Sequence, residues 1–146
     1  MQWIVCAIGK PKLPFARAGI EEYEGRLRQF APVRLHYLKA GTKEAESRAL
    51  LERSQGWLRI AMDERGEQVT SRALAEKIGR WEQDRVKGVA LLVGGAEGHQ
   101  EKLRAEADWS WSLSRLTLQH ELALTVALEQ LYRAYTIKAG LPYHRA

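Results

Sequence analysis

The sequence contains only one cysteine, Cys6, so no disulfide can form within the chain. Its neighbours in the apolar run 3–8 indicate a small buried side chain rather than a reactive thiol. No apolar run approaches the roughly 20 residues that span a bilayer, and the apolar start, residues 1–8, is too short for a signal peptide. We therefore expect a cytoplasmic protein with no membrane contact.

Motifs for metal-dependent, nucleotide-hydrolysing and serine-hydrolase chemistry are also missing. The chain has four histidines, all far apart in the sequence, and neither a cysteine pair nor an H-E-x-x-H motif. It has no Walker A loop and no G-x-S-x-G elbow. We therefore expect no metal site and no enzyme of these classes.

Dense basic runs are absent as well. The net charge of the 146 residues is +5, and most of the excess lies in residues 1–53. A positive net charge is compatible with a polyanionic partner such as RNA, but an ordinary solvated surface explains it equally well. Charge alone therefore favours RNA only weakly.

Hydrophobic patterning predicts strands that alternate with helices. Short apolar or alternating runs predict strands at residues 3–8, 33–38, 57–62, 89–93 and 109–113. Apolar positions at helical spacing predict helices at residues 15–30, 42–54, 70–81, 103–107 and 121–138, with a polar turn at 63–66 and a free tail at 143–146. This alternation is typical of one α/β domain, residues 1–146, with a mainly parallel sheet covered by helices on both faces.

Three segments that follow strands are expected at one edge of this sheet, where ligands of parallel sheets bind. They are the segment after Met62, the glycine cluster at residues 94–98, and residues 113–120. The cluster departs from the G-x-G-x-x-G dinucleotide fingerprint, and it suits either a tight turn or a close approach of backbone to a ligand. Residues 113–120 suit either a loop packed on the core or a ligand loop whose leucines enclose an apolar ring.

The last predicted helix carries apolar residues on more than one face. One face holds Leu124, Leu128, Leu131 and Tyr135, and another holds Leu122 and Val126. This is more apolar surface than one sheet face requires, and such a surplus is commonly buried against a partner. The helix therefore predicts a homodimer with two-fold symmetry.

Four motifs in the second half of the chain resemble those of the RlmH family. They are GGAEG at residues 94–98, WSLSRLTLQH at 111–120, EQLYRA at 129–134 and PYHR at 142–145. This family comprises ribosomal large-subunit pseudouridine N3-methyltransferases of the SPOUT superfamily. The resemblance covers essentially the whole chain, is weaker across residues 40–56, and departs at Gln119, where the family usually has proline.

The resemblance implies a SPOUT-type α/β knot, a C-terminal trefoil knot, in a homodimer whose active site lies at the interface. It implies S-adenosyl-L-methionine as cofactor, with 23S rRNA of the assembled ribosome as substrate. The implied cofactor contacts are Met62, Gly94, Gly95, Leu113, Ser114, Arg115, Leu116, Thr117 and Leu118.

Methylation at N3 of a pseudouridine requires the N3 proton to leave, which calls for a base and for a group that stabilises negative charge. Among the matched residues, His120 or His144 is the candidate base, and Arg145 or Arg133 the candidate for the charge. A capping or packing histidine at a helix start is an equally good interpretation of His120. Tyr143, His144 and Arg145 are interpreted as RNA contacts, although without the resemblance they read as a frayed terminus.

Two other functions remain compatible with the sequence. The chain could be a non-catalytic RNA-binding or ribosome-assembly module on the same fold, or a methyltransferase that acts on a small molecule. Binding of S-adenosylmethionine with methyl transfer would exclude the first, and labelled methyl groups found in RNA would exclude the second.

Overall fold

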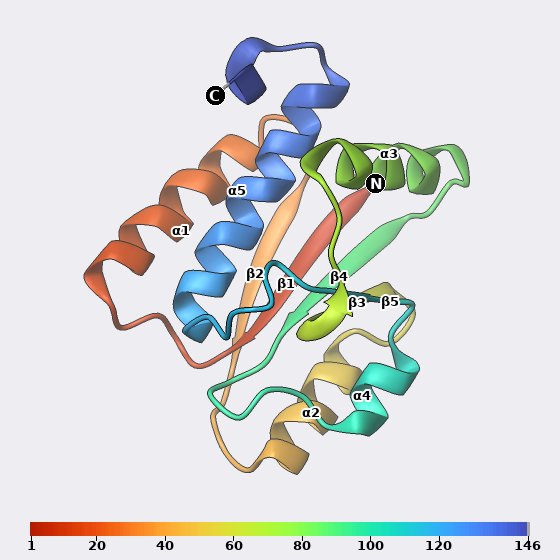
Figure 1. Cartoon of the computed structure of the whole chain (residues 1–146). Coiled ribbons are helices and arrows are strands. Elements are labelled where there is room, and N and C mark those ends of the chain that lie inside the picture. Colours follow the sequence, from red (N-terminus) through yellow and green to blue (C-terminus); the bar gives the residue numbers. More distant parts are fainter. Residues whose placement is uncertain (146) are drawn as a thin grey trace.

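The computed structural model describes the backbone of residues 1–145 and the side chains of residues 1–143 (Figure 1). Strands and helices alternate along the described chain: β1 (Gln2–Ile8), α1 (Pro14–Leu27), β2 (Val33–Leu38), α2 (Lys43–Arg53), β3 (Leu58–Glu67), α3 (Ser71–Gln83), β4 (Gly88–Val93), α4 (Glu101–Glu106), β5 (Trp109–Trp111), α5 (His120–Lys138) and the 3₁₀ helix η1 (Pro142–Arg145). No helix in this described part is both long and apolar enough to cross a bilayer.

The strands form one sheet in the order β2-β1-β4-β3-β5, and every pairing is parallel. Helices α1, α3 and α5 cover one face of the sheet, and α2 and α4 cover the other (Figure 1). The predicted α/β fold, with a parallel sheet between two helical layers, is therefore confirmed.

Alternation along β1 builds a core on each face of the sheet. Trp3 and Val5 pack in the cluster beneath α1, α3 and α5, whereas Ile4 and Cys6 pack in the cluster beneath α2 and α4. Cys6 has no exposed surface, and burial raises the pKa of its thiol to about 11. The interpretation of Cys6 as a buried apolar side chain is confirmed.

Side-chain caps fix the starts of three helices. The hydroxyl of Thr42 accepts from the N–H of Ala45 at 3.1 Å, and Thr70 accepts from Ala73 at 3.0 Å. Each hydroxyl satisfies a backbone donor that the helix leaves unpaired. The third cap is Gln119, at the start of α5.

Two local predictions are wrong. Residues 63–66 form no separate turn, because β3 continues to Glu67 and pairs with β5 again after a register shift between Met62 and Glu67. Gly66 permits this approach, since a Cβ there would lie 2.6 Å from the backbone of Ser110. The tail is not free, because η1 packs on α5 and the Tyr143 hydroxyl donates to Glu129 Oε2 at 2.8 Å.

Candidate active site

The second half of β3 and the segments that follow β4 and β5 line one cavity of about 210 Å³. Met62 and the next three residues contribute from β3, residues 93–99 from the end of β4, and Trp111 with parts of residues 113–118 from the end of β5. Because all strands are parallel, these segments meet at the carboxyl edge of the sheet, where ligands of such sheets bind.

The glycine cluster that follows β4 forms a tight turn, which a backbone hydrogen bond within the cluster closes. The N–H of Gly98 donates to the carbonyl of Gly95 at 3.0 Å, and Gly98 has a φ of 76°. A Cβ on Gly94 would lie 3.0 Å from the carbonyl carbon of Gly98, and one on Gly95 would lie 2.9 Å from Glu46 Oε1. The turn itself therefore requires these glycines, and it places their backbone in the cavity lining.

Directly after this turn, His99 is almost completely buried, with 3% of its surface exposed. Its Nε2 lies 3.1 Å from the carbonyl oxygen of Leu92, so Nε2 donates. Nδ1 is buried and has no hydrogen-bond partner among the described residues. Burial lowers the pKa of the ring, against the opposing effects of the Leu92 carbonyl and Asp63. Arg104 donates to the His99 carbonyl at 2.8 Å and pairs with Asp63 at 3.4 Å, so it connects the segment after β4 to β3.

The connection between β5 and α5 is held by short-range hydrogen bonds. The buried hydroxyl of Ser112 donates to the carbonyl of Ser114 at 2.9 Å, and Ser114 Oγ accepts from the N–H of Leu116 at 3.0 Å. Thr117 donates to Glu64 across the cavity mouth. Leu116 is 73% exposed, so this loop presents a large apolar side chain beside the cavity.

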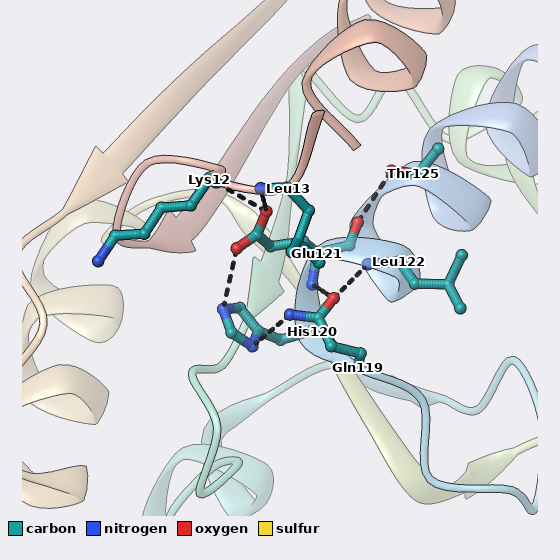
Figure 2. Close-up of polar contacts among 7 residues, drawn as sticks. All are labelled: Lys12, Leu13, Gln119, His120, Glu121, Leu122 and Thr125. Atoms are coloured by element: carbon teal, nitrogen blue, oxygen red, sulfur yellow. Dashed lines mark hydrogen bonds and ion pairs between the residues drawn. The ribbon is translucent and has the colours of Figure 1, made fainter. Parts of the chain in front are cut away.

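The start of α5 joins this loop to the segment before α1 (Figure 2). Gln119 Oε1 accepts from the N–H groups of Glu121 and Leu122, at 2.8 and 3.0 Å, and so caps the helix. Glu121 is 8% exposed, and its Oε1 accepts from the N–H groups of Lys12 and Leu13, at 2.8 and 3.0 Å. His120, between them, lines the cavity.

The cavity thus brings together His120 with most of the predicted cofactor contacts: Met62, Gly94, Gly95, Leu113, Ser114, Leu116, Thr117 and Leu118. Arg115 is not among its lining residues. Sequence reasoning missed His99, Asp63 and Arg104. The available signal for Asp63 was its polar character directly after the apolar run that ends at Met62. His99 and Arg104 follow the glycine cluster, and no local pattern marks them.

Arg133 and Tyr143 lie elsewhere, in the second half of α5 and in η1. Arg133 pairs with Glu129 at 2.8 Å, and its guanidinium lies 4.8 Å from the centre of the Tyr143 ring. Burial and the Glu129 carboxylate raise the pKa of Tyr143. Thirteen residues of helix separate Arg133 from His120, which is about 20 Å along the axis. They therefore do not meet at the cavity of one chain, and the side chains of His144 and Arg145 lie outside the described residues.

The lining suits S-adenosyl-L-methionine, the cofactor that the sequence resemblance implies. Met62 and Leu113 offer apolar surface for a flat ring, and the backbone at Gly94 allows close approach. The lining also carries charged side chains of both signs, among them Asp63 and Arg104, which pair with each other at 3.4 Å. Within the described residues, no group of three or more His, Cys, Asp or Glu side chains could hold a metal ion.

Comparisons with known proteins cover the same span. Residues 1–144 match the family model described as "Predicted SPOUT methyltransferase". A protein from Thermus thermophilus named ribosomal RNA large subunit methyltransferase H is 48% identical over 145 residues, which are 99% of each chain.

Solved structures show the same fold at low identity. A probable methylase family protein from Haemophilus influenzae has a TM-score of 0.58 at 11% identity, covering 99% of this chain and 70% of that one. The SpoU methyltransferase AviRb from Streptomyces viridochromogenes, solved in complex with the cofactor AdoMet, has a TM-score of 0.50 at 14% identity, covering 92% and 58%.

Proposed function

This chain belongs to the SPOUT methyltransferase family, and on that premise we propose that it transfers a methyl group from S-adenosyl-L-methionine to RNA of the large ribosomal subunit. The observation that carries the proposal is the convergence of the second half of β3 and the segments after β4 and β5 on one cavity. The T. thermophilus protein that matches along the whole chain bears a name with the same activity. The resemblance to RlmH drawn from the motifs is confirmed.

Leu113, Ser114 and residues 116–118, with Met62, Gly94 and Gly95, would hold the cofactor in this cavity. AviRb, which shares the fold, was solved with the same cofactor. When bound, S-adenosylmethionine supplies an electrophilic methyl group, so the chain's main contribution is to align the acceptor with it. The tight turn at Gly94 and the hydrogen-bonded loop at Ser112–Ser114 are rigid supports for such positioning.

The finer proposal is that the acceptor is N3 of a pseudouridine in 23S rRNA. This specificity rests on the resemblance to the RlmH family. N3 carries a proton that must leave, and His120 lines the cavity, where its ring can take that proton or stabilise the resulting charge. With a net charge of +5 and no dense basic run, the chain has little electrostatic grip on free RNA. We therefore expect the assembled ribosome or large subunit as substrate, which also puts the protein in the cytoplasm.

In a homodimer, residues in the second half of α5 could contribute to the cavity of the partner chain. Arg133 and Tyr143 are too far from the cavity of their own chain to act there, so they can contribute only to a partner's cavity. Leu122 and Val126 are only half-buried on α5. Phe15 and Leu116 are exposed apolar side chains, 54% and 73% respectively. We propose that these apolar surfaces are buried between two copies of the chain.

Two measurements test the proposed activity. Calorimetry should detect binding of S-adenosylmethionine that is unchanged by EDTA, and EDTA-sensitive binding would contradict a metal-free site. Ribosomes from a deletion strain, incubated with the protein and radiolabelled cofactor, should gain label in 23S rRNA, and mass spectrometry should place it on a pseudouridine. Label that appears only in small metabolites, or binding without transfer, would reject the proposal.

A further inference from the structure

The amide of Gln119 has a fixed orientation at the start of α5 (Figure 2). Its Oε1 accepts from two backbone N–H groups, those of Glu121 and Leu122, at 2.8 and 3.0 Å. With the oxygen committed to the helix, the amide nitrogen lies on the other side, 3.4 Å from Nδ1 of His120. An exchange of oxygen and nitrogen in this amide would set an NH₂ group against two N–H donors, so the orientation follows from the cap.

This orientation selects one tautomer of His120. An amide NH₂ group can only donate, so Nδ1 of the neutral ring accepts and the ring proton sits on Nε2. Nε2 lies 4.0 Å from Glu121 Oε2, a carboxylate that favours a proton on the facing nitrogen. Gln119 and Glu121 therefore favour the same tautomer from opposite sides of the ring.

Glu121 is itself anchored. Its other oxygen, Oε1, accepts from the backbone N–H groups of Lys12 and Leu13, residues more than 100 positions away in the sequence. The carboxylate is 8% exposed and bridges α5 to the segment that connects β1 with α1. Because these backbone N–H groups hold Oε1 and α5 holds the backbone of Glu121, Oε2 stays in place beside Nε2 of His120.

We propose that Gln119 and Glu121 are positioning residues that hold His120 as an Nε2–H hydrogen-bond donor at the cavity. Resting on the proposed function, this assigns His120 a role different from that of the base. When N3 of the base loses its proton to solvent water, negative charge spreads onto the two flanking carbonyl oxygens. Nε2 lies 4.0 Å from Glu121 Oε2, which is beyond hydrogen-bond distance, so its N–H can donate to one of these oxygens instead. This donor stabilises the charge, and His120 neither gains nor loses a proton in the step.

The variant Gln119→Glu tests the tautomer. A carboxylate in this place still accepts from Glu121 and Leu122, so the cap is kept, but it cannot donate to Nδ1 of His120. Nitrogen NMR of the cofactor-free protein at alkaline pH, with the His120→Asn spectrum for assignment, should show Nε2–H in the wild type and Nδ1–H in Gln119→Glu. An Nδ1–H wild type would overturn the proposal. An unchanged tautomer in the variant would contradict the role of Gln119, because Glu121 alone would then set the tautomer.

Kinetics test the role of the donor. In Gln119→Glu, kcat should fall by at least about tenfold, because a preorganised donor of this kind is worth on the order of 10²–10³ in kcat. Cofactor affinity and melting temperature should stay near the wild-type values. A variant with the switched tautomer and full kcat would remove His120 from the reaction.

Two substitutions at Glu121 distinguish its hydrogen bonds to Lys12 and Leu13 from the effect of its negative charge. Glu121→Gln keeps an acceptor for Lys12 and Leu13, whereas Glu121→Ala removes it, so only the alanine variant should speed hydrogen exchange at those two amides. Equal exchange in both variants would contradict the anchor. Should wild-type protein fail to methylate ribosomes, the proposed function falls, while the NMR spectra still decide the tautomer.

Discussion

His99 is a buried neutral imidazole whose environment makes protonation costly. Burial is the largest influence and lowers its pKa from 6.5. Arg104 acts in the same direction, while Asp63 and the Leu92 carbonyl oppose it. The unfolded chain, in which the ring is solvated, therefore binds a proton at higher pH than the folded chain does.

Stability should accordingly fall as the pH drops below about 6.5. Protonation of His99 lowers the free energy of unfolding by at most about 1.4 kcal/mol per pH unit, which is the limit for one proton. Urea unfolding at neutral and mildly acidic pH should show a smaller pH dependence in His99→Gln than in the wild type. His36→Gln is the control, because this more exposed ring, whose pKa is also lowered by burial, should matter less. Equal slopes for His99→Gln and wild type would reject the assignment.

Gly94 permits a second test at the scale of one residue. The added Cβ of Gly94→Ala would press on the Gly98 backbone at 3.0 Å and on the His99 ring at 3.2 Å, so the turn must shift. Calorimetry should show cofactor affinity reduced by about tenfold or more, that is about 1.4 kcal/mol. The control is Gly25→Ala in α1, where a Cβ meets nothing within 4 Å and helix propensity should add about 0.5–1 kcal/mol of stability. Unchanged affinity in a folded Gly94→Ala protein would remove Gly94 from the site.

Sequence reasoning at this scale succeeded where the partners are near neighbours. The apolar neighbours of Cys6 in residues 3–8 predict its burial, and Cys6 has no exposed surface. The contact of Glu121 with Lys12 spans 109 positions. No local pattern contains such a contact, because only the finished fold brings α5 to the end of β1.

At the scale of elements, periodicity predicted which segments are strands and helices. It missed the end of β3, where Asp63, Glu64 and Arg65 look like a turn because polar side chains line a cavity instead of a core. Periodicity also cannot predict the strand order, because the hydrophobic pattern of β1 is the same whichever strands flank it. The trefoil knot implied by the family stays a prediction.

The packing of α1 on α5 depends on one small residue. A Cβ on Gly19 would lie 2.7 Å from Cγ2 of Thr125, so Gly19→Ala should destabilise the fold by about 1–3 kcal/mol, less the gain of helix propensity. Thr125→Ser removes only Cγ2 and keeps the hydroxyl that donates to the Glu121 carbonyl. Urea unfolding of a double-mutant cycle should show Thr125→Ser rescuing Gly19→Ala. If the changes in the free energy of unfolding caused by Gly19→Ala and Thr125→Ser are additive, the added Cβ is not accommodated at Cγ2 of Thr125.

At the scale of the whole molecule, the rule for parallel sheets predicted that three separate segments meet at one edge, and they line one cavity. The same reasoning could not place Arg133 and Tyr143, because sequence order does not show how far a helix carries its end from the sheet edge. Their position about 20 Å from His120 makes the site of a single chain incomplete under the proposed function.

Deleting residues 143–146 tests whether a partner completes the site. The truncation removes the Tyr143–Glu129 hydrogen bond, a loss of about 1 kcal/mol, so the domain should stay folded. Cofactor affinity should remain within a few fold of normal, and methylation of ribosomes should be lost. Tyr143→Phe, which lacks only the hydroxyl, is the control for the loss of this hydrogen bond.

Mixed dimers then show which chain supplies the tail. Tail-less subunits with an intact cavity are combined with full-length subunits whose cavity is blocked by Gly94→Val. If the tail completes the partner's cavity, each mixed dimer has one working site, and an equal mixture should recover about one quarter of wild-type activity. If the tail serves its own chain, neither subunit has both parts and the mixture stays inactive. Sedimentation that shows an active monomer at micromolar concentration would defeat completion of the site by a partner.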